Sequence, residues 1–172
     1  YVWVGKGSSG TACYVSTQRT TPFGITNYND YVRRVGSILC SDNALTMVPF
    51  SQHGSSNDRW YTYECEKIDY NTRALSAGSD TAWTAVVLSG TVPPTACAAI
   101  IVFTVAASVG NLAYVRRRGV GSTTVSRNTF VICTDIGGSN SHLTFPIDGA
   151  QVVDYAVNNA AVDAYIDVVG YQ

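Results

Sequence analysis

Short runs in which apolar and polar residues alternate constrain the fold of this chain more than any other feature. The run from Arg59 to Lys67 alternates with a period of two, which places Tyr61 and Tyr63 on one face of a strand. The run from Val162 to Val169 alternates similarly, and its β-branched residues disfavour a helix. Turn-forming segments such as Ser76–Asp80 recur about every 8–12 residues. This pattern predicts an all-β chain of about a dozen short strands with essentially no helix, folded as an antiparallel β-sandwich or jelly roll.

The strand-and-turn pattern occurs twice along the chain. Arg33-Arg34 opens an arginine-containing strand in the first half, and a second arginine-rich strand follows in the other half. Residues 1–75 and 76–172 therefore suggest either a quasi-repeat or the two sheets of one sandwich. No linker of low complexity separates these halves, and 172 residues are enough to bury one core. We expect a single domain over residues 1–172.

The composition disfavours several classes of partner. Only 13% of the residues are charged, and 11 Lys and Arg nearly balance 12 Asp and Glu. So weak a charge gives no electrostatic attraction for nucleic acid or an anionic membrane. The apolar run Ala96–Val109 is shorter than the roughly 20 residues of a membrane-spanning helix, and we interpret it as a buried strand. We therefore expect no nucleic-acid partner and no membrane insertion.

The five cysteines form no C-x-x-C pair and lie in apolar or alternating runs. We interpret them as buried free thiols, as expected in a reducing cytoplasm, and the alternative is one structural disulfide. They are Cys13, Cys40, Cys65, Cys97 and Cys133.

Two motifs that are typical of cofactor or metal sites lack their usual context. Gly5–Gly10 reads GKGSSG and matches the dinucleotide fingerprint, but an alternating strand follows it where the fingerprint needs a helix. We therefore predict a hairpin loop there. His53 and His142 are the only histidines, and each lies in a Gly/Ser-rich loop without a neighbouring ligand. We expect no cofactor and no metal.

Acid pairs for glycoside hydrolysis would have to come from Glu64 with Glu66 or from Asp163 with Asp167. Both pairs lie on the polar face of an alternating strand, where acidic side chains are common. We therefore predict a protein that is not an enzyme.

The arginine clusters predict ion pairs. Adjacent residues of a strand face opposite sides, so each cluster sends one guanidinium inward, where it needs a carboxylate. Our hypothesis is that one arginine of each cluster pairs with an aspartate or contacts a neighbouring subunit, and anion binding is the alternative. The residues concerned are Arg33, Arg34, Arg116, Arg117 and Arg118.

An aromatic group beside the predicted loop Gln52–Asp58 is a candidate for ligand binding. Amphipathic rings often stack on sugars at binding surfaces, and Trp60 is the strongest candidate. The alternative for the two tyrosines is a place in the core. The candidate ligand or host contacts are His53, Arg59, Trp60, Tyr61, Tyr63 and His142.

The order of several short motifs resembles a module found in virion proteins of tailed bacteriophages. Tyr31–Ile38 has the order aromatic, any residue, Arg-Arg, hydrophobic residue, Gly-Ser and Ile, and it is followed by a turn, a strand ending Pro49-Phe50, a glutamine and a Gly-rich loop. In the second half, the resemblance continues through Val92-Pro93, Phe145–Asp148 and the ending Val169–Tyr171. The module occurs in tail fibres, appendages and other proteins of the particle surface.

The resemblance implies an all-β protein on the virion exterior, commonly a homotrimer, assembled in the host cytoplasm and without catalytic residues. We therefore expect a structural or adhesive component of a tail fibre or other appendage. The loops Gln52–Asp58 and Asp135–His142 would contact other virion proteins or a glycan of the host surface. The alternatives are a capsid-attached decoration or head-fibre protein, and a polysaccharide-degrading tailspike domain.

Overall fold

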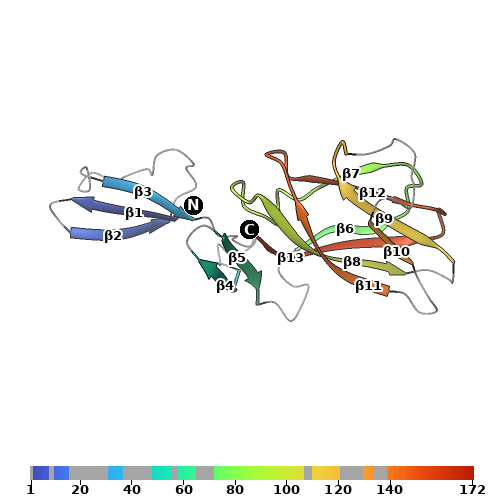
Figure 1. Ribbon diagram of the computed structural model, residues 1–172, viewed down its shortest axis with the longest axis horizontal. Helices are drawn as coiled ribbons and strands as arrows, with labels where there is room; N and C mark the ends of the chain where they lie inside the picture. Colours follow the sequence, from blue (N-terminus) through green and yellow to red (C-terminus); the bar gives the residue numbers. More distant parts are fainter. Residues whose placement is uncertain are drawn as a thin grey trace. The chain divides into compact units, whose positions relative to one another are not determined.

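The structure is a computed structural model in which most of the chain is described. Side chains are described for residues 48–55, 58–64, 72–106, 110–120 and 140–172, and the backbone also for 2–7, 10–15, 31–36, 130–133 and 139. These residues form antiparallel sheets and contain no helix (Figure 1). The all-β prediction is therefore confirmed for this part of the chain. The chain divides into two compact units, Tyr1–Cys40 and Ser41–Gln172.

The first unit contains one antiparallel sheet of three strands. These are β1 (Val2–Gly7), β2 (Gly10–Val15) and β3 (Tyr31–Gly36), in the order β2-β1-β3. Gly7 pairs with Gly10, so the glycine-rich motif lies where β1 and β2 form an antiparallel pair. The loop predicted for Gly5–Gly10 is wrong at its ends, because Gly5–Gly7 belong to β1 and Gly10 to β2. In β3, the backbone of Arg33 pairs with Val4 and that of Arg34 with Trp3, while their side chains lie outside the described residues.

The second unit contains two sheets. The four-stranded sheet has the order β10-β9-β12-β7, and the six-stranded sheet has the order β11-β8-β13-β5-β4, with β6 also paired to β13. The bounds are β4 (Phe50–Ser55), β5 (Asp58–Tyr63), β6 (Arg73–Gly78), β7 (Thr84–Val87), β8 (Ala98–Ala106), β9 (Leu112–Arg117), β10 (Phe130–Cys133), β11 (Ser139–Pro146), β12 (Val152–Val157) and β13 (Asp163–Tyr171).

Alternation along the strands builds the core of the second unit. In β8 and β13 every second side chain is buried, and the register pairs Phe103 with Ile166, so these buried residues share one face of the sheet. In the four-stranded sheet, Tyr155 of β12 is also buried. A methyl group on Gly78 of β6 would lie 2.7 Å from the Tyr155 ring, so the two sheets meet at this point and the glycine makes room for the ring.

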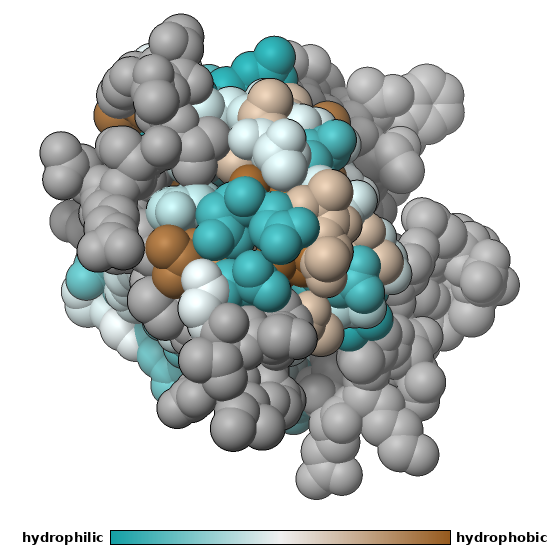
Figure 2. Space-filling model, turned by 90° about the vertical axis from the view of Figure 1, so that its right-hand side faces the viewer, coloured by the Kyte–Doolittle hydropathy of each residue, from teal (hydrophilic) through white to brown (hydrophobic). Residues whose placement is uncertain are grey.

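Few large hydrophobic side chains remain on the surface of the second unit. In the view from the right of Figure 1, hydrophobic residues are scattered among hydrophilic ones and form no single large patch (Figure 2). Among the described residues, Val87 and Val120 are the large hydrophobic residues that are exposed. The apolar residues are thus used mainly for the core, at roughly 1.5–3 kcal/mol for each fully buried large side chain.

Three Gly/Ser-rich segments that we predicted as loops or turns lie partly in strands. β4 extends to Ser55, β6 extends to Gly78, and β11 begins at Ser139, so that His142 lies in a strand. The loop and turn assignments were therefore wrong at these positions. Pairing with a neighbouring strand outweighs the weak local preference of Gly and Ser for turns. The strand that we expected to end at Pro49-Phe50 lies mostly outside the described residues, and β4 begins at Phe50.

The chain divides into its two compact units between Cys40 and Ser41. Positions 75 and 76, where the sequence suggested a boundary between two repeats, lie inside β6.

One cysteine differs from the buried thiols that we predicted. Cys97 is free but exposed, because it lies just before β8, beyond the end of the buried face of that strand. The side chains of the other four cysteines lie outside the described residues.

Candidate functional site

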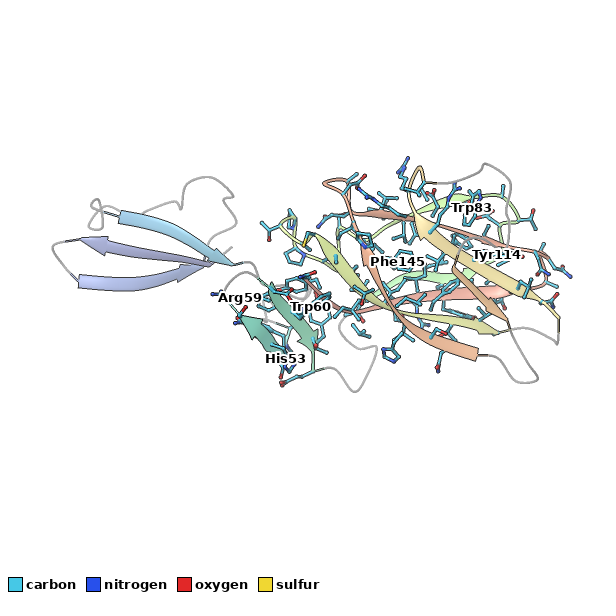
Figure 3. All side chains as sticks on the ribbon, in the orientation of Figure 1. His53, Arg59, Trp60, Trp83, Tyr114 and Phe145 are labelled. Atoms are coloured by element: carbon cyan, nitrogen blue, oxygen red, sulfur yellow. The ribbon has the colours of Figure 1, made fainter. Side chains whose placement is uncertain are left out.

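The β4–β5 hairpin places the best candidate residue, Trp60, opposite His53 (Figure 3). Residues that are directly opposite in an antiparallel pair project from the same face. Ser51 is opposite Thr62 on that face as well. We call this surface the Trp60 face, and it consists of Ser51, His53, Asp58, Trp60, Thr62 and Glu64.

The opposite face of the hairpin carries an aromatic cluster. Tyr61 stacks on Tyr171 of β13, with ring centroids 4.7 Å apart and an interplanar angle of 12°. Phe50 meets Tyr61 edge to face, at 5.5 Å between centroids. Tyr63 lies 5.9 Å from Tyr171 and donates a hydrogen bond of 2.6 Å from its hydroxyl to the Thr91 carbonyl oxygen. Burial, followed by the nearby Tyr61, raises the pKa of Tyr171. This cluster attaches the hairpin to β13, its neighbour in the six-stranded sheet.

A glycine allows that attachment. Gly170 of β13 pairs with Thr62, and a side chain at position 170 would clash with the Tyr61 carbonyl oxygen. Only a residue without a Cβ lets the two backbones approach this closely. The hairpin is therefore held both by ring stacking and by close contact between main chains.

Hydrogen bonds position two carboxylates on the Trp60 face. The Ser51 hydroxyl donates to Glu64 Oε1, and the Gln172 side-chain amide donates to Asp58 Oδ1. Within the described part of the chain, neither the Trp60 nor the His53 side chain has a hydrogen-bond or ring partner. Trp60 is half-buried and His53 is exposed. This face thus combines one indole with several polar groups.

The structure separates the six residues that we predicted as ligand contacts. His53 and Trp60 share one face, while Arg59 lies on the opposite face across from Gly54. Tyr61 and Tyr63 belong to the aromatic cluster, and Tyr63 is buried, which corresponds to the core alternative for that residue. His142 is exposed on β11, across from Val102 of β8 and away from the hairpin in the strand order.

One arginine of the second cluster forms an ion pair that is almost fully buried. Arg116 Nε lies 3.1 Å from Asp154 Oδ2, and the two residues are directly opposite in β9 and β12. The Arg116 guanidinium also lies 4.0 Å from the centre of the Trp83 ring, and Trp83 meets Tyr114 edge to face (Figure 3). Arg117 and Arg118 are exposed and have no partner among the described residues.

Sequence reasoning missed a second ion pair, between Arg73 of β6 and Asp167 of β13. The Arg73 Nε and Nη2 atoms lie 2.7 and 3.0 Å from the two carboxylate oxygens, and the guanidinium lies 5.1 Å from the centre of the Tyr165 ring. The hydrogen bond to Asp167 raises the pKa of Arg73. The alternation of β13 placed Asp167 on the polar face, but no local signal identified β6 as its neighbour.

The acids that we considered for glycoside hydrolysis have other contacts. Asp167 is paired with Arg73, Glu64 accepts from Ser51, and Asp163 is exposed at the start of β13. Glu66 lies outside the described residues. Within the described ranges, no three His, Cys, Asp or Glu side chains are grouped closely enough to hold a metal ion. The same ranges include no helix of the length and hydrophobicity needed to cross a membrane.

Comparison of the chain with protein-family models and with curated proteins gives no match. The inference about function therefore depends on the residues of this chain and on their arrangement.

Proposed function

We propose that this protein is a non-enzymatic structural and adhesive component of a tailed-phage virion, in a tail fibre or another exterior appendage. The sequence pattern that begins at Tyr31–Ile38 supports the virion assignment. The β4–β5 hairpin supports adhesion, and it is the observation on which this part depends. One face of the hairpin is fixed to the sheet by aromatic stacking, while the other presents Trp60 among polar side chains.

The fold that we propose for the second unit is an antiparallel β-sandwich with jelly-roll-like connections. The contact between Gly78 and Tyr155 supports two sheets packed face to face. The Tyr155 hydroxyl also donates to Asp80 Oδ2 at 2.7 Å, which joins β12 to the segment that follows β6. In such sandwiches the loops cluster at the two ends.

The ion pairs favour a structural role for the strand acids. Asp167 and Asp154 are both neutralised by an arginine directly opposite, an arrangement that links neighbouring strands. A tailspike enzyme would instead need two carboxylates that flank a sugar, one of them able to donate a proton. We therefore favour the adhesive function over the hydrolytic one.

Immunogold labelling of purified phage particles, with an antibody against this chain, tests the proposal. Label at the tail or at fibre tips is expected. Label over the head would favour the alternative, a capsid-attached decoration protein. Particles without label would contradict a virion function altogether.

The oligomeric state provides a second test. We propose a homotrimer that contacts neighbouring virion proteins, and light scattering after gel filtration should give three times the mass of the chain, which is 18.4 kDa. A monomer at micromolar concentration would contradict the trimer.

A further inference from the structure

We propose that the Trp60 face binds a neutral, hydroxyl-rich sugar. This inference rests on the proposed adhesive function and specifies its ligand class. The site consists of the Trp60 indole and the polar side chains beside it on β4 and β5.

The indole supplies the apolar part of such a site. A pyranose ring presents C–H groups on one side, and aromatic side chains with a polar tip pack well against amphipathic molecules of this kind. Trp60 stacks on no ring among the described residues, whereas Tyr61 and Trp83 are both in ring contacts. Among these residues its ring is therefore not used for aromatic packing, and its Nε1 is a hydrogen-bond donor for a hydroxyl.

The polar side chains near Trp60 would orient a bound sugar through hydrogen bonds. The Glu64 and Asp58 carboxylates each accept one hydrogen bond within the chain, from Ser51 and from Gln172. A carboxylate has lone pairs for further donors, so Asp58, two residues from Trp60 on the same face, can accept a hydrogen bond from a sugar hydroxyl. Glu64 lies four residues from Trp60, at about 13 Å along the strand, where it would be reached only by a longer saccharide. His53 lies directly opposite Trp60 and adds another polar group. A few fixed polar groups around an apolar surface are typical of small-molecule sites.

The charge of the face disfavours an anionic ligand. Two carboxylates belong to it, and no Lys or Arg does among the described residues, because Arg59 projects from the opposite side. Like charges brought together at an interface are unfavourable, so uronic and sialic acids should bind less well than neutral hexoses.

The site is also held in shape before any ligand binds. The stack of Tyr61 on Tyr171 and the close contact at Gly170 fix the opposite side of the hairpin. Gly54 near the hairpin end has a φ of 90°, and a Cβ there would clash with the Asp58 carbonyl oxygen. A site that needs little ordering loses less free energy on binding.

Saturation-transfer NMR on the purified full chain tests the inference. The probes are methyl β-glucoside, methyl β-galactoside and N-acetylglucosamine as neutral sugars, with glucuronate as the anionic one, all at millimolar concentration. We expect transfer to the ring C–H protons of at least one neutral sugar and a weaker signal for glucuronate. No transfer to any neutral probe, or equal transfer to glucuronate, would overturn the assignment.

Two variants locate the site. Trp60→Ala should weaken binding about tenfold or more, as expected for an aromatic anchor, while Trp60→Phe should retain part of it. Val87→Ala, which removes an exposed hydrophobic side chain of β7 outside the Trp60 face, is the control and should bind like the unchanged chain. Unaltered binding by Trp60→Ala would exclude this face. If Trp60→Ala does not fold by circular dichroism, Asp58→Asn replaces it, and it should weaken binding several-fold.

The two proposals can fail separately, because the NMR experiment needs no particle and the labelling needs no sugar. A labelled tail without sugar binding would reject this inference alone. Sugar binding at Trp60 without labelled particles would reject the virion function alone.

Discussion

Two Arg–Asp ion pairs, one in each sheet of the second unit, join directly opposite residues but differ in their surroundings. Arg116 and Asp154 are directly opposite in the four-stranded sheet, as are Arg73 and Asp167 in the six-stranded sheet. The first pair is buried, with 12% and 9% of its side chains exposed, and the second is more open, at 30% and 15%. An aromatic ring lies near each arginine, at 4.0 Å for Trp83 and 5.1 Å for Tyr165.

We expect burial, more than contact geometry, to decide what each pair contributes to the free energy of unfolding. The more open pair has the better geometry, because Arg73 meets both carboxylate oxygens. Water and salt nevertheless screen a partly exposed pair, which limits its contribution. The buried pair is not a large net source of stability either, but losing one partner leaves an uncompensated charge. The two pairs should therefore respond very differently to the same substitution.

The largest expected effect comes from Asp154→Asn. It leaves the Arg116 charge without its carboxylate in a buried position, and we expect a loss of about 3 kcal/mol in the free energy of unfolding. The matched variant, Asp167→Asn, should lose about 1 kcal/mol or less. Denaturation by guanidinium chloride measures both. Equal losses would mean that burial does not distinguish the pairs.

A double variant checks the cause of this loss. In Arg116→Met with Asp154→Leu, no charge remains to be neutralised, and most of the lost stability should return. If the double variant is as unstable as Asp154→Asn, then the loss comes from packing and not from the unpaired charge.

The next effect concerns the rings beside the arginines. Trp83→Leu removes the ring 4.0 Å from Arg116 and should cost about 1–2 kcal/mol, because this cation is largely desolvated. Tyr165→Leu should cost about 0.5 kcal/mol, since the cation there is closer to water. Trp83→Phe keeps a ring and removes an Nε1 that is buried without an acceptor among the described residues, so it should cost less than Trp83→Leu. Thermal or denaturant unfolding ranks the three variants.

Tyr155 lies in the same strand as Asp154 and allows the buried ion pair to be compared with a buried group that carries no charge. Burial first, and then its hydrogen bond to Asp80, raise the pKa of Tyr155 above the ordinary value of about 10. The unfolded chain therefore releases this proton first, and stability should fall as the pH rises above about 10 and through the raised pKa. In Tyr155→Phe this part of the decline should be absent, at a cost of about 1 kcal/mol at neutral pH. Unfolding measured from pH 8 to 11 compares the slopes. If the free energy of unfolding falls equally steeply with pH in Tyr155→Phe, then the decline does not come from Tyr155.

The smallest effects should come from the neighbours of the buried arginine. Arg117→Ala and Arg118→Ala should each change stability by no more than about 0.5 kcal/mol, because both side chains are exposed and without partners among the described residues. A loss from Arg117→Ala as large as that from Asp154→Asn would show that the strand faces are assigned incorrectly. Denaturation in guanidinium chloride again provides the measurement.

The sequence alone determined which residues share a face. The alternation between Arg59 and Lys67 separated Trp60 from Tyr61, and the hairpin has them on opposite sides. In the same way, Arg116 and Arg117 project from opposite faces of β9, and only the first is paired with an acid within the described residues. These features could be predicted because the period of two belongs to the strand itself and needs no partner.

Only the tertiary structure decided which strands are neighbours and in what register. Arg116 and Asp154 are 38 residues apart in the chain, and Arg73 and Asp167 are 94 apart. The stacking of Tyr61 on Tyr171 also joins distant strands, and strand pairing extended β4 and β11 into Gly/Ser-rich segments that resemble loops. Local alternation determines which face of a strand a side chain lies on. Which strands pair is determined by the burial of whole sheet faces, and the free energy of that burial depends on the entire sheet.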